Sequence, residues 1–156
     1  MELRLPTSLV QLIMSCLTTV RTNVLWEWEL TDDISPSRGV RQGDPLSPYI
    51  FVLSIERLSH GIYESIRRNM WRPIRLSRSG PPLSHLFLAD DLLLLTKASN
   101  DQAQFITEVL DSFCLSSGAK VNKTKTQVFF SHNVPGLTVH ALSNEFGFTV
   151  TSDLGK

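Results

Sequence analysis

The segment Ser84-His85-Leu86-Phe87-Leu88-Ala89-Asp90-Asp91-Leu92-Leu93-Leu94-Leu95 places two adjacent carboxylates between two apolar runs. Each run has the length of a short β-strand and aspartate favours turns, so the segment predicts a β-hairpin with Asp90 and Asp91 at or near its turn. The apolar residues on both sides of each strand predict burial on both faces. Adjacent aspartates repel each other, and a divalent cation is the simplest compensation.

The same pair has a simpler interpretation, in which Asp90 and Asp91 open a loop or cap a helix that begins at Leu92. A second pair, Asp32 and Asp33, lies in a polar setting and predicts only an ordinary turn. A hairpin that lifts two aspartates out of a packed sheet would instead suit Mg²⁺. Proteins typically hold this ion through one or two carboxylates plus substrate phosphates.

A second informative segment covers residues 36–48 and reads Pro-Ser-Arg-Gly-Val-Arg-Gln-Gly-Asp-Pro-Leu-Ser-Pro. It predicts a loop that enters a helix, because its glycines permit close backbone approach, Asp44 is an N-cap candidate and Pro45 fits the first helical turn. Helix N-termini attract anions, and Arg41 and Gln42 add hydrogen-bond donors for a phosphate, a sugar or a base edge. An ordinary loop-to-helix junction would have a similar sequence.

The run Arg41-Gln42-Gly43-Asp44-Pro45-Leu46-Ser47-Pro48, followed some forty residues later by Leu88-Ala89-Asp90-Asp91, closely resembles the palm of reverse transcriptases from plant LINE-type, non-LTR retrotransposons. The family usually has an aromatic residue where Leu88 stands. A third match, Ser-Gly-Ala-Lys-Val-Asn-Lys-Thr-Lys-Thr at residues 117–126, is similar to the family segment after the helix that follows the catalytic hairpin. The resemblance covers nearly the whole chain.

This resemblance implies an RNA-directed DNA polymerase, a nucleotidyltransferase in which two Mg²⁺ ions act on an in-line phosphoryl displacement. It makes Asp90 and Asp91 the metal ligands of the catalytic hairpin. Lys125 matches the lysine that protonates the leaving pyrophosphate, although Lys123 lies only two residues away. The residues implied to lie near the template and the incoming nucleotide are Arg41, Gln42 and Gly43. The implied partners are an RNA template, a DNA primer, a dNTP and the remainder of the reverse transcriptase chain.

Family members carry a third catalytic carboxylate in an upstream segment of the form Phe-Asp-x-x-Lys-Ala-Tyr-Asp, which this sequence does not contain. We therefore expect residues 1–156 to be a partial reverse transcriptase domain, from fingers and palm, without the first-aspartate strand and the thumb. Such a fragment of a transposable element is expected to be inactive as an isolated chain. Two alternatives stay open. In the first, the chain is a non-catalytic RNA-binding module or inert retroelement remnant. In the second, it is an unrelated domain whose motifs match by chance.

Charge is unevenly distributed along the chain. Its net charge of zero is unlike that of a free-standing nucleic-acid-binding domain. From Ser65 to Ala89 there is no acidic residue, whereas five arginines lie near Trp71. These are Arg67, Arg68, Arg72, Arg75 and Arg78. The strip predicts either a surface that contacts phosphates, with Trp71 as an aromatic platform, or merely a solvated helix end.

The hydrophobic spacing predicts an α+β fold with helices on one side of a small antiparallel sheet, and the resemblance makes it a polymerase palm fragment whose catalytic-type hairpin packs against helices. With 42% hydrophobic residues, the 156-residue chain can bury one core, which favours a single domain. The predicted helices cover residues 7 or 8 to 20, 45–69, 99 or 100 to 118, and 139–146. The predicted strands cover residues 24–30, 74–76, 84–95 as the hairpin, and 128–130.

Neither a membrane-spanning run nor a signal peptide is visible in the sequence, so we expect an intracellular protein, either nuclear or cytoplasmic, without a membrane partner. Cys16 and Cys114 lack metal-type spacing and lie in apolar helical patterns, which predicts buried, reduced thiols. None of the histidines is assigned to catalysis. They are His60, His85, His132 and His140.

Overall fold

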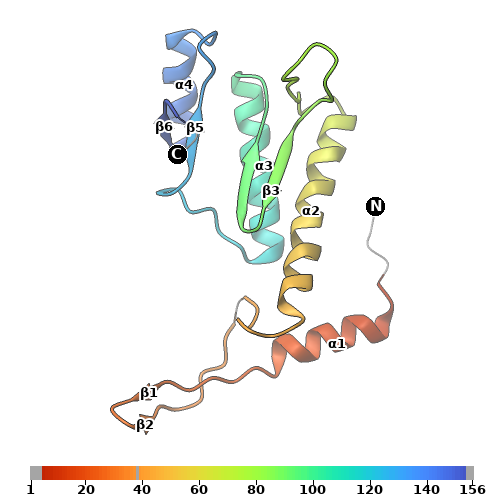
Figure 1. The fold of residues 1–156 in the computed structure, drawn as a ribbon, viewed down its shortest axis with the longest axis vertical. Helices are drawn as coiled ribbons and strands as arrows, with labels where there is room; N and C mark the ends of the chain where they lie inside the picture. The colour runs from red at the N-terminus through yellow and green to blue at the C-terminus, as the bar shows by residue number, and fades with distance from the viewer. Residues whose placement is uncertain (1–4, 38, 154–156) are drawn as a thin grey trace. The chain divides into compact units, whose positions relative to one another are not determined.

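The computed structural model of the protein describes residues 5–37 and 39–153, and its chain divides into two compact units, residues 1–56 and 57–156. Figure 1 shows the elements. The helices are α1 (Thr7–Thr18), α2 (Ser47–Arg67), α3 (Asn100–Ser117) and α4 (Gly136–Phe146). The strands are β1 (Leu25–Trp26), β2 (Glu29–Leu30), β3 (His85–Leu88), β4 (Asp91–Leu94), β5 (Gln127–Phe129) and β6 (Thr149–Thr151). The predicted α+β class is confirmed.

The first unit contains α1 and a short hairpin of β1 and β2. The single half-buried strand predicted over residues 24–30 is wrong, because the chain reverses at Glu27 and Trp28. Both residues have positive φ, 48° and 71°, and Trp26 pairs with Glu29 across the ladder. Two consecutive positive φ values are the pattern of a type I′ turn. Both strands are exposed, and Trp28 at the turn is 91% exposed.

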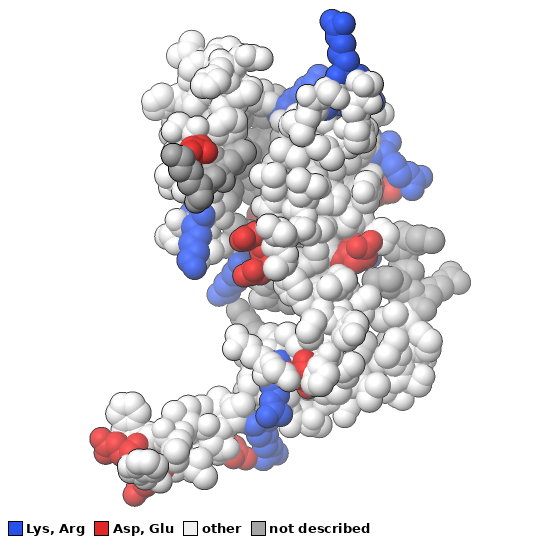
Figure 2. All heavy atoms as spheres, in the orientation of Figure 1, with Lys and Arg blue, Asp and Glu red and all other residues white. Residues whose placement is uncertain are grey.

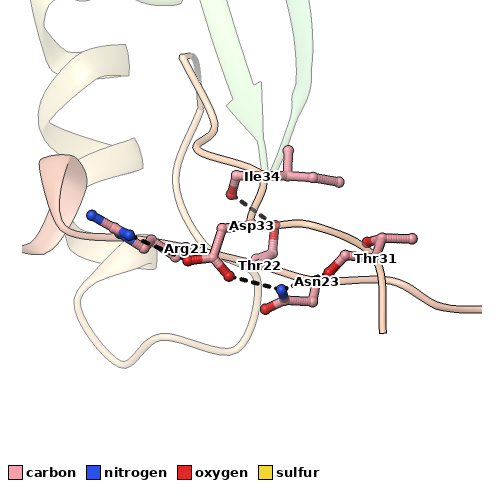
Figure 3. Close-up of polar contacts among 6 residues, drawn as sticks. All are labelled: Arg21, Thr22, Asn23, Thr31, Asp33 and Ile34. Carbon is pink, nitrogen blue, oxygen red and sulfur yellow. Dashed lines mark hydrogen bonds and ion pairs between the residues drawn. The ribbon is translucent and has the colours of Figure 1, made fainter. Parts of the chain in front are cut away.

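Polar contacts hold the base of this hairpin together (Figure 3). Thr22 and Ile34 exchange two backbone hydrogen bonds of 3.0 and 2.7 Å. The carboxylate of Asp33 accepts hydrogen bonds from the Asn23 side chain at 2.8 Å and from Arg21 at 3.2 Å. These hydrogen bonds lower the pKa of Asp33 below its ordinary value, and the bond from Asn23 has the largest effect, followed by that from Arg21. Desolvation raises the pKa of Asp33 and so acts in the opposite direction. Asp33 is therefore an acceptor at the hairpin base and not part of the ordinary turn that we predicted.

The second unit has a small hydrophobic core between helices and the β3–β4 hairpin. Its buried members are Leu58, Ile62, Trp71 and Ile106. Partly buried side chains of the hairpin pack against this core, namely Phe87, Leu92 and Leu94. The hairpin therefore rests on the helices as predicted, and Figure 1 shows it alongside α2 and α3.

Burial of both faces of this hairpin was predicted and is wrong. Exposure alternates along β3 and β4, with Leu86 and Leu88 50% and 76% exposed. Only one face packs against the core, because side chains of a strand alternate between two faces and the core cluster contacts one of them. The other face presents apolar side chains to the surface.

The remaining elements follow α3. This helix ends at Gly118, whose φ of 72° is the left-handed conformation that glycine adopts without strain, and the predicted helix end is confirmed. Strands β5 and β6 form a parallel pair connected through α4, unlike the antiparallel β1–β2 and β3–β4 pairs. The strand predicted at residues 74–76 is reduced to one bridge between Ile74 and Leu83.

Two further expectations concern thiols and membranes. Cys16 and Cys114 are free thiols of intermediate exposure, so they are less buried than predicted. Within the described residues, every helix is too short or too polar to cross a membrane.

Candidate functional site

The β3–β4 hairpin closes through a two-residue turn. Leu88 pairs with Asp91, which leaves Ala89 and Asp90 as the turn residues. The φ angle is positive at Ala89, at 53°, but not at Asp90, which is the pattern of a type II′ turn. This position favours glycine, so Ala89 holds a strained backbone conformation.

The turn presents both carboxylates to solvent. Asp90 and Asp91 are exposed, and within the described residues neither side chain forms a hydrogen bond or an ion pair. The prediction that the pair lies at a hairpin turn is confirmed. The alternative of a helix cap is wrong, because Leu92 continues the strand that begins at Asp91.

A buried tryptophan fixes the open end of the hairpin. Trp71 is 2% exposed, and its indole Nε1 donates a hydrogen bond to the carbonyl oxygen of Leu95 at 3.1 Å. The backbone N–H of Leu95 in turn donates to the carbonyl oxygen of Ser84 at 2.7 Å, which extends the ladder by one pair. The proposed role of Trp71 as an aromatic platform for bases is wrong, because its ring fills the core.

Gln102 joins the same end of the hairpin to α3. This side chain is 3% exposed, and its Oε1 accepts hydrogen bonds from the backbone N–H of Arg72 and the hydroxyl of Thr96, each at 2.7 Å. Its Nε2 donates to the carbonyl oxygen of Met70 at 2.6 Å. Gln102 was not among the residues predicted from the sequence. The available signal was its place beside Ala103 on the buried face of α3.

His85 is held between two serine hydroxyls at the start of β3. Its Nε2 lies 3.1 Å from the Oγ of Ser59, and its Nδ1 lies 2.9 Å from the Oγ of Ser84. The imidazole also packs edge-on against the ring of Tyr63, with centroids 5.3 Å apart. These contacts tie β3 to α2. They hold the His85 ring in place at the start of the hairpin.

The donor set of the turn fits a hard divalent cation. Within the described parts of the chain, no group of three or more histidine, cysteine, aspartate or glutamate side chains is placed to hold a metal. The protein ligands available at the turn are two carboxylates, those of Asp90 and Asp91. Such a set suits Mg²⁺, which combines one or two protein carboxylates with waters and substrate phosphate oxygens.

The glycine-containing loop of the first unit leads into α2 as predicted. The carboxylate of Asp44 accepts the backbone N–H of Leu46 at 2.8 Å, and the hydroxyl of Ser47 donates to the carbonyl oxygen of Arg41 at 2.5 Å. Gly43 has a φ of 86°, so this position requires a residue that tolerates the left-handed conformation. A pocket of about 350 Å³ is lined by Leu17, Val20, Thr22, Pro36, Gly39, Val40, Arg41 and Gln42.

Lys123 and Lys125 both lie exposed in the loop between α3 and β5. The side-chain oxygen of Asn122 accepts the backbone N–H groups of Thr124 and Lys125, each at 3.2 Å, and so fixes the turn. Figure 1 shows this loop at the same end of the second unit as the β3–β4 turn. Within the described residues no contact distinguishes the two lysines, so the role of Lys125 stays a prediction.

The arginine strip falls into two parts. Arg67 and Arg68 both pair with Glu64, at 3.4 and 2.9 Å, at the end of α2. The others lie in the following loop. They are Arg72, Arg75 and Arg78, all exposed. Figure 2 shows basic side chains gathered at this end of the second unit.

Comparison with known proteins identifies relatives over most of the chain. The sequence model of the protein family described as "Reverse transcriptase (RNA-dependent DNA polymerase)" matches residues 2–146. An uncharacterized mitochondrial protein of Arabidopsis thaliana is 34% identical over 106 residues, which are 65% of this chain and 83% of that protein. The Pol polyprotein of the type-1 retrotransposable element R2 of Popillia japonica is 30% identical over 127 residues, 81% of this chain and 20% of the polyprotein.

A second polyprotein, from the type-2 retrotransposable element R2DM of Drosophila melanogaster, is 30% identical over 95 residues, 61% of this chain and 8% of the polyprotein. This chain therefore spans a small part of each of the two polyproteins that it matches. The matches bear out the resemblance that the three sequence motifs indicated.

Proposed function

Because the chain belongs to the reverse transcriptase family, we propose that it supplies the metal-binding hairpin and the nucleotide-facing loop of an RNA-directed DNA polymerase from a non-LTR retrotransposon. One observation carries this proposal. The two-residue turn of the β3–β4 hairpin exposes two adjacent carboxylates, Asp90 and Asp91, that no other described side chain neutralises.

Asp90 and Asp91 would hold Mg²⁺ during nucleotide addition. The ion, when bound, would supply Lewis-acid stabilisation of the phosphoryl oxygens and would favour deprotonation of the attacking hydroxyl. The chain contributes the hairpin that carries these carboxylates, and Trp71 and Gln102 anchor the open end of this hairpin to the core.

Lys125 is proposed to protonate the leaving pyrophosphate. In this reaction the 3′ hydroxyl of the primer releases its proton to water, and its oxygen forms a bond to the α-phosphorus of the dNTP. The bond from that phosphorus to the oxygen that bridges to the β-phosphorus breaks. The ammonium group of Lys125 would give a proton to the departing oxygen. Its place on a turn ordered by Asn122, at the end of the unit that carries the aspartates, supports this role.

Arg41, Gln42 and Gly43 are proposed to contact the RNA template and the incoming nucleotide. Arg41 and Gln42 both line the pocket of about 350 Å³ in the first unit. The guanidinium of Arg41 and the amide of Gln42 are groups that bind phosphates or base edges. Gly43, without a side chain, leaves open space beside the backbone. A β-carbon at this position would be strained by the positive φ.

Primer extension tests the proposal. A polypeptide that carries these residues is incubated with an RNA template, a DNA primer, dNTPs and Mg²⁺. The changes Asp90→Asn and Asp91→Asn should each lower extension by at least roughly a hundredfold, since both remove a metal ligand. Asp32→Asn is the matched control, because Asp32 is an exposed acid of the first unit. Undiminished extension by the Asp90→Asn variant would remove Asp90 from this role.

A further inference from the structure

The loop that follows α2 is held by hydrogen bonds at both of its ends. We name residues 70–83 the arginine loop. Gln102 and the buried Trp71 hold its beginning, and Ile74 and Leu83 close its end with two backbone hydrogen bonds of 2.9 and 2.7 Å. Within it, the guanidinium of Arg75 donates to the carbonyl oxygen of Gly80 at 3.0 Å.

Positive charge on this loop is not compensated within the described residues. Arg72, Arg75 and Arg78 are exposed and form no ion pair there, whereas Arg67 and Arg68 share Glu64. Lys97 adds a further exposed cation nearby, since its neighbour Thr96 donates to the carbonyl oxygen of Arg72 at 3.1 Å. The loop is therefore a fixed cationic surface.

The arginine loop lies at the opposite end of the second unit from the turn that carries Asp90 and Asp91 (Figure 1). The two are separated by the length of the β3–β4 hairpin. Four residues of extended strand span about 13 Å, at about 3.3 Å per residue. The loop thus does not belong to the proposed metal site.

We propose that the arginine loop binds the phosphate backbone of a nucleic acid, at a surface separate from the proposed metal site. The planar guanidinium fork matches two phosphate oxygens, so arginine is well suited to this ligand. Because hydrogen bonds already hold the backbone of the loop, binding costs little backbone conformational entropy. This inference goes beyond the proposed polymerase function and does not depend on it.

The composition of the loop argues against other anionic partners. A protein interface contains a buried apolar or aromatic centre, and a lipid surface binds through an apolar face. The arginine loop exposes one large apolar side chain, Leu76, and its tryptophan is buried. A repeated, strongly charged ligand with little apolar surface fits better.

Fluorescence anisotropy with labelled single-stranded U20 RNA and dT20 DNA tests the proposal on the full chain. The test variant is Arg72→Gln with Arg78→Gln, which keeps the bond from Arg75 to Gly80. The matched control is Arg57→Gln with Lys120→Gln, two exposed cations outside the loop. Both double variants lower the net charge equally, so a difference between them reports position rather than total charge.

Loss of two phosphate contacts should lower the slope of log K against log salt concentration by about 1.4 and weaken binding at low salt roughly tenfold or more. The control should keep the wild-type slope. Arg72→Lys with Arg78→Lys should also keep that slope, because both charges remain, but should bind more weakly because lysine lacks the guanidinium fork. Stronger binding of RNA than DNA, or the reverse, identifies the nucleic acid. Equal losses in the test and control variants, or tighter binding of poly-aspartate or phosphatidylserine vesicles than of U20 and dT20, would overturn the proposal.

Discussion

Leu88 pairs with Asp91 across the β3–β4 ladder, and this register decides where the two carboxylates lie. A shift of β4 by one residue would turn its side chains to the opposite face and remove the core contact of Leu92. The position of Asp90 is therefore fixed by two features, the tight turn and the packed face of the hairpin. The same tight turn forces Ala89 into the left-handed region.

Replacement of Ala89 by glycine should relieve this strain. We expect Ala89→Gly to raise the free energy of unfolding by about 1 kcal/mol, measured by urea denaturation. The same substitution at Ala141, an exposed position inside α4, should lower it by about 1 kcal/mol because glycine disfavours helix. A loss of stability for Ala89→Gly similar to that of the control would contradict the strained turn.

Removal of the Gln102 side chain should destabilise the second unit strongly. Gln102→Ala deletes three hydrogen bonds and leaves partly buried backbone and hydroxyl groups without this partner. We expect a loss of about 3 kcal/mol in the free energy of unfolding. Gln104→Ala is the matched control, because Gln104 is exposed on the same helix, and it should change stability by less than about 0.5 kcal/mol. Similar values for both variants would refute the anchoring role.

Trp71 offers a separate probe of the hairpin anchor. Trp71→Phe keeps an aromatic ring in the core but removes the donor to the carbonyl oxygen of Leu95. We expect a loss of about 1 to 3 kcal/mol and faster amide hydrogen exchange in β4 than in α4. Unchanged exchange in β4 would mean that the indole hydrogen bond does not hold the hairpin.

The base of the β1–β2 hairpin should respond to acid. The pKa of Asp33 is lowered in the folded chain, so its stabilising contribution is present above the unfolded pKa and is lost as pH falls through the folded pKa. NMR titration of the Asp33 carboxyl group measures this directly. Asn23→Ala should move its midpoint upward, because Asn23 is the largest cause of the shift, and an unmoved midpoint would contradict the contact in Figure 3.

The sequence predicted the elements whose pattern is local. Helices α2 and α3 repeat apolar residues at helical spacing, and the hairpin at Asp90 is flanked by two apolar runs, so all three were found. The turn at Glu27 and Trp28 was missed, because neither residue is the asparagine or glycine that a type I′ turn usually contains.

The remaining errors have a tertiary origin. Burial of Trp71 and Gln102 depends on contacts between segments some thirty residues apart, such as the 2.7 Å bond from Arg72 to Gln102, and no local pattern encodes them. The two faces of the β3–β4 hairpin are both apolar in sequence, so only the packing of the helices shows which one is covered. The roles of the site residues came from the family resemblance and stay predictions.

Paramagnetic broadening by Mn²⁺, a substitute for Mg²⁺, tests the central claim most directly because it requires no catalysis. In backbone NMR spectra of the chain, we predict that low Mn²⁺ concentrations broaden the amide signals of residues 89–92 first. Asp90→Asn with Asp91→Asn should abolish this selectivity, whereas Asp32→Asn should preserve it. Broadening that begins elsewhere, or that persists at residues 89–92 in the double variant, would contradict a metal site at the hairpin turn.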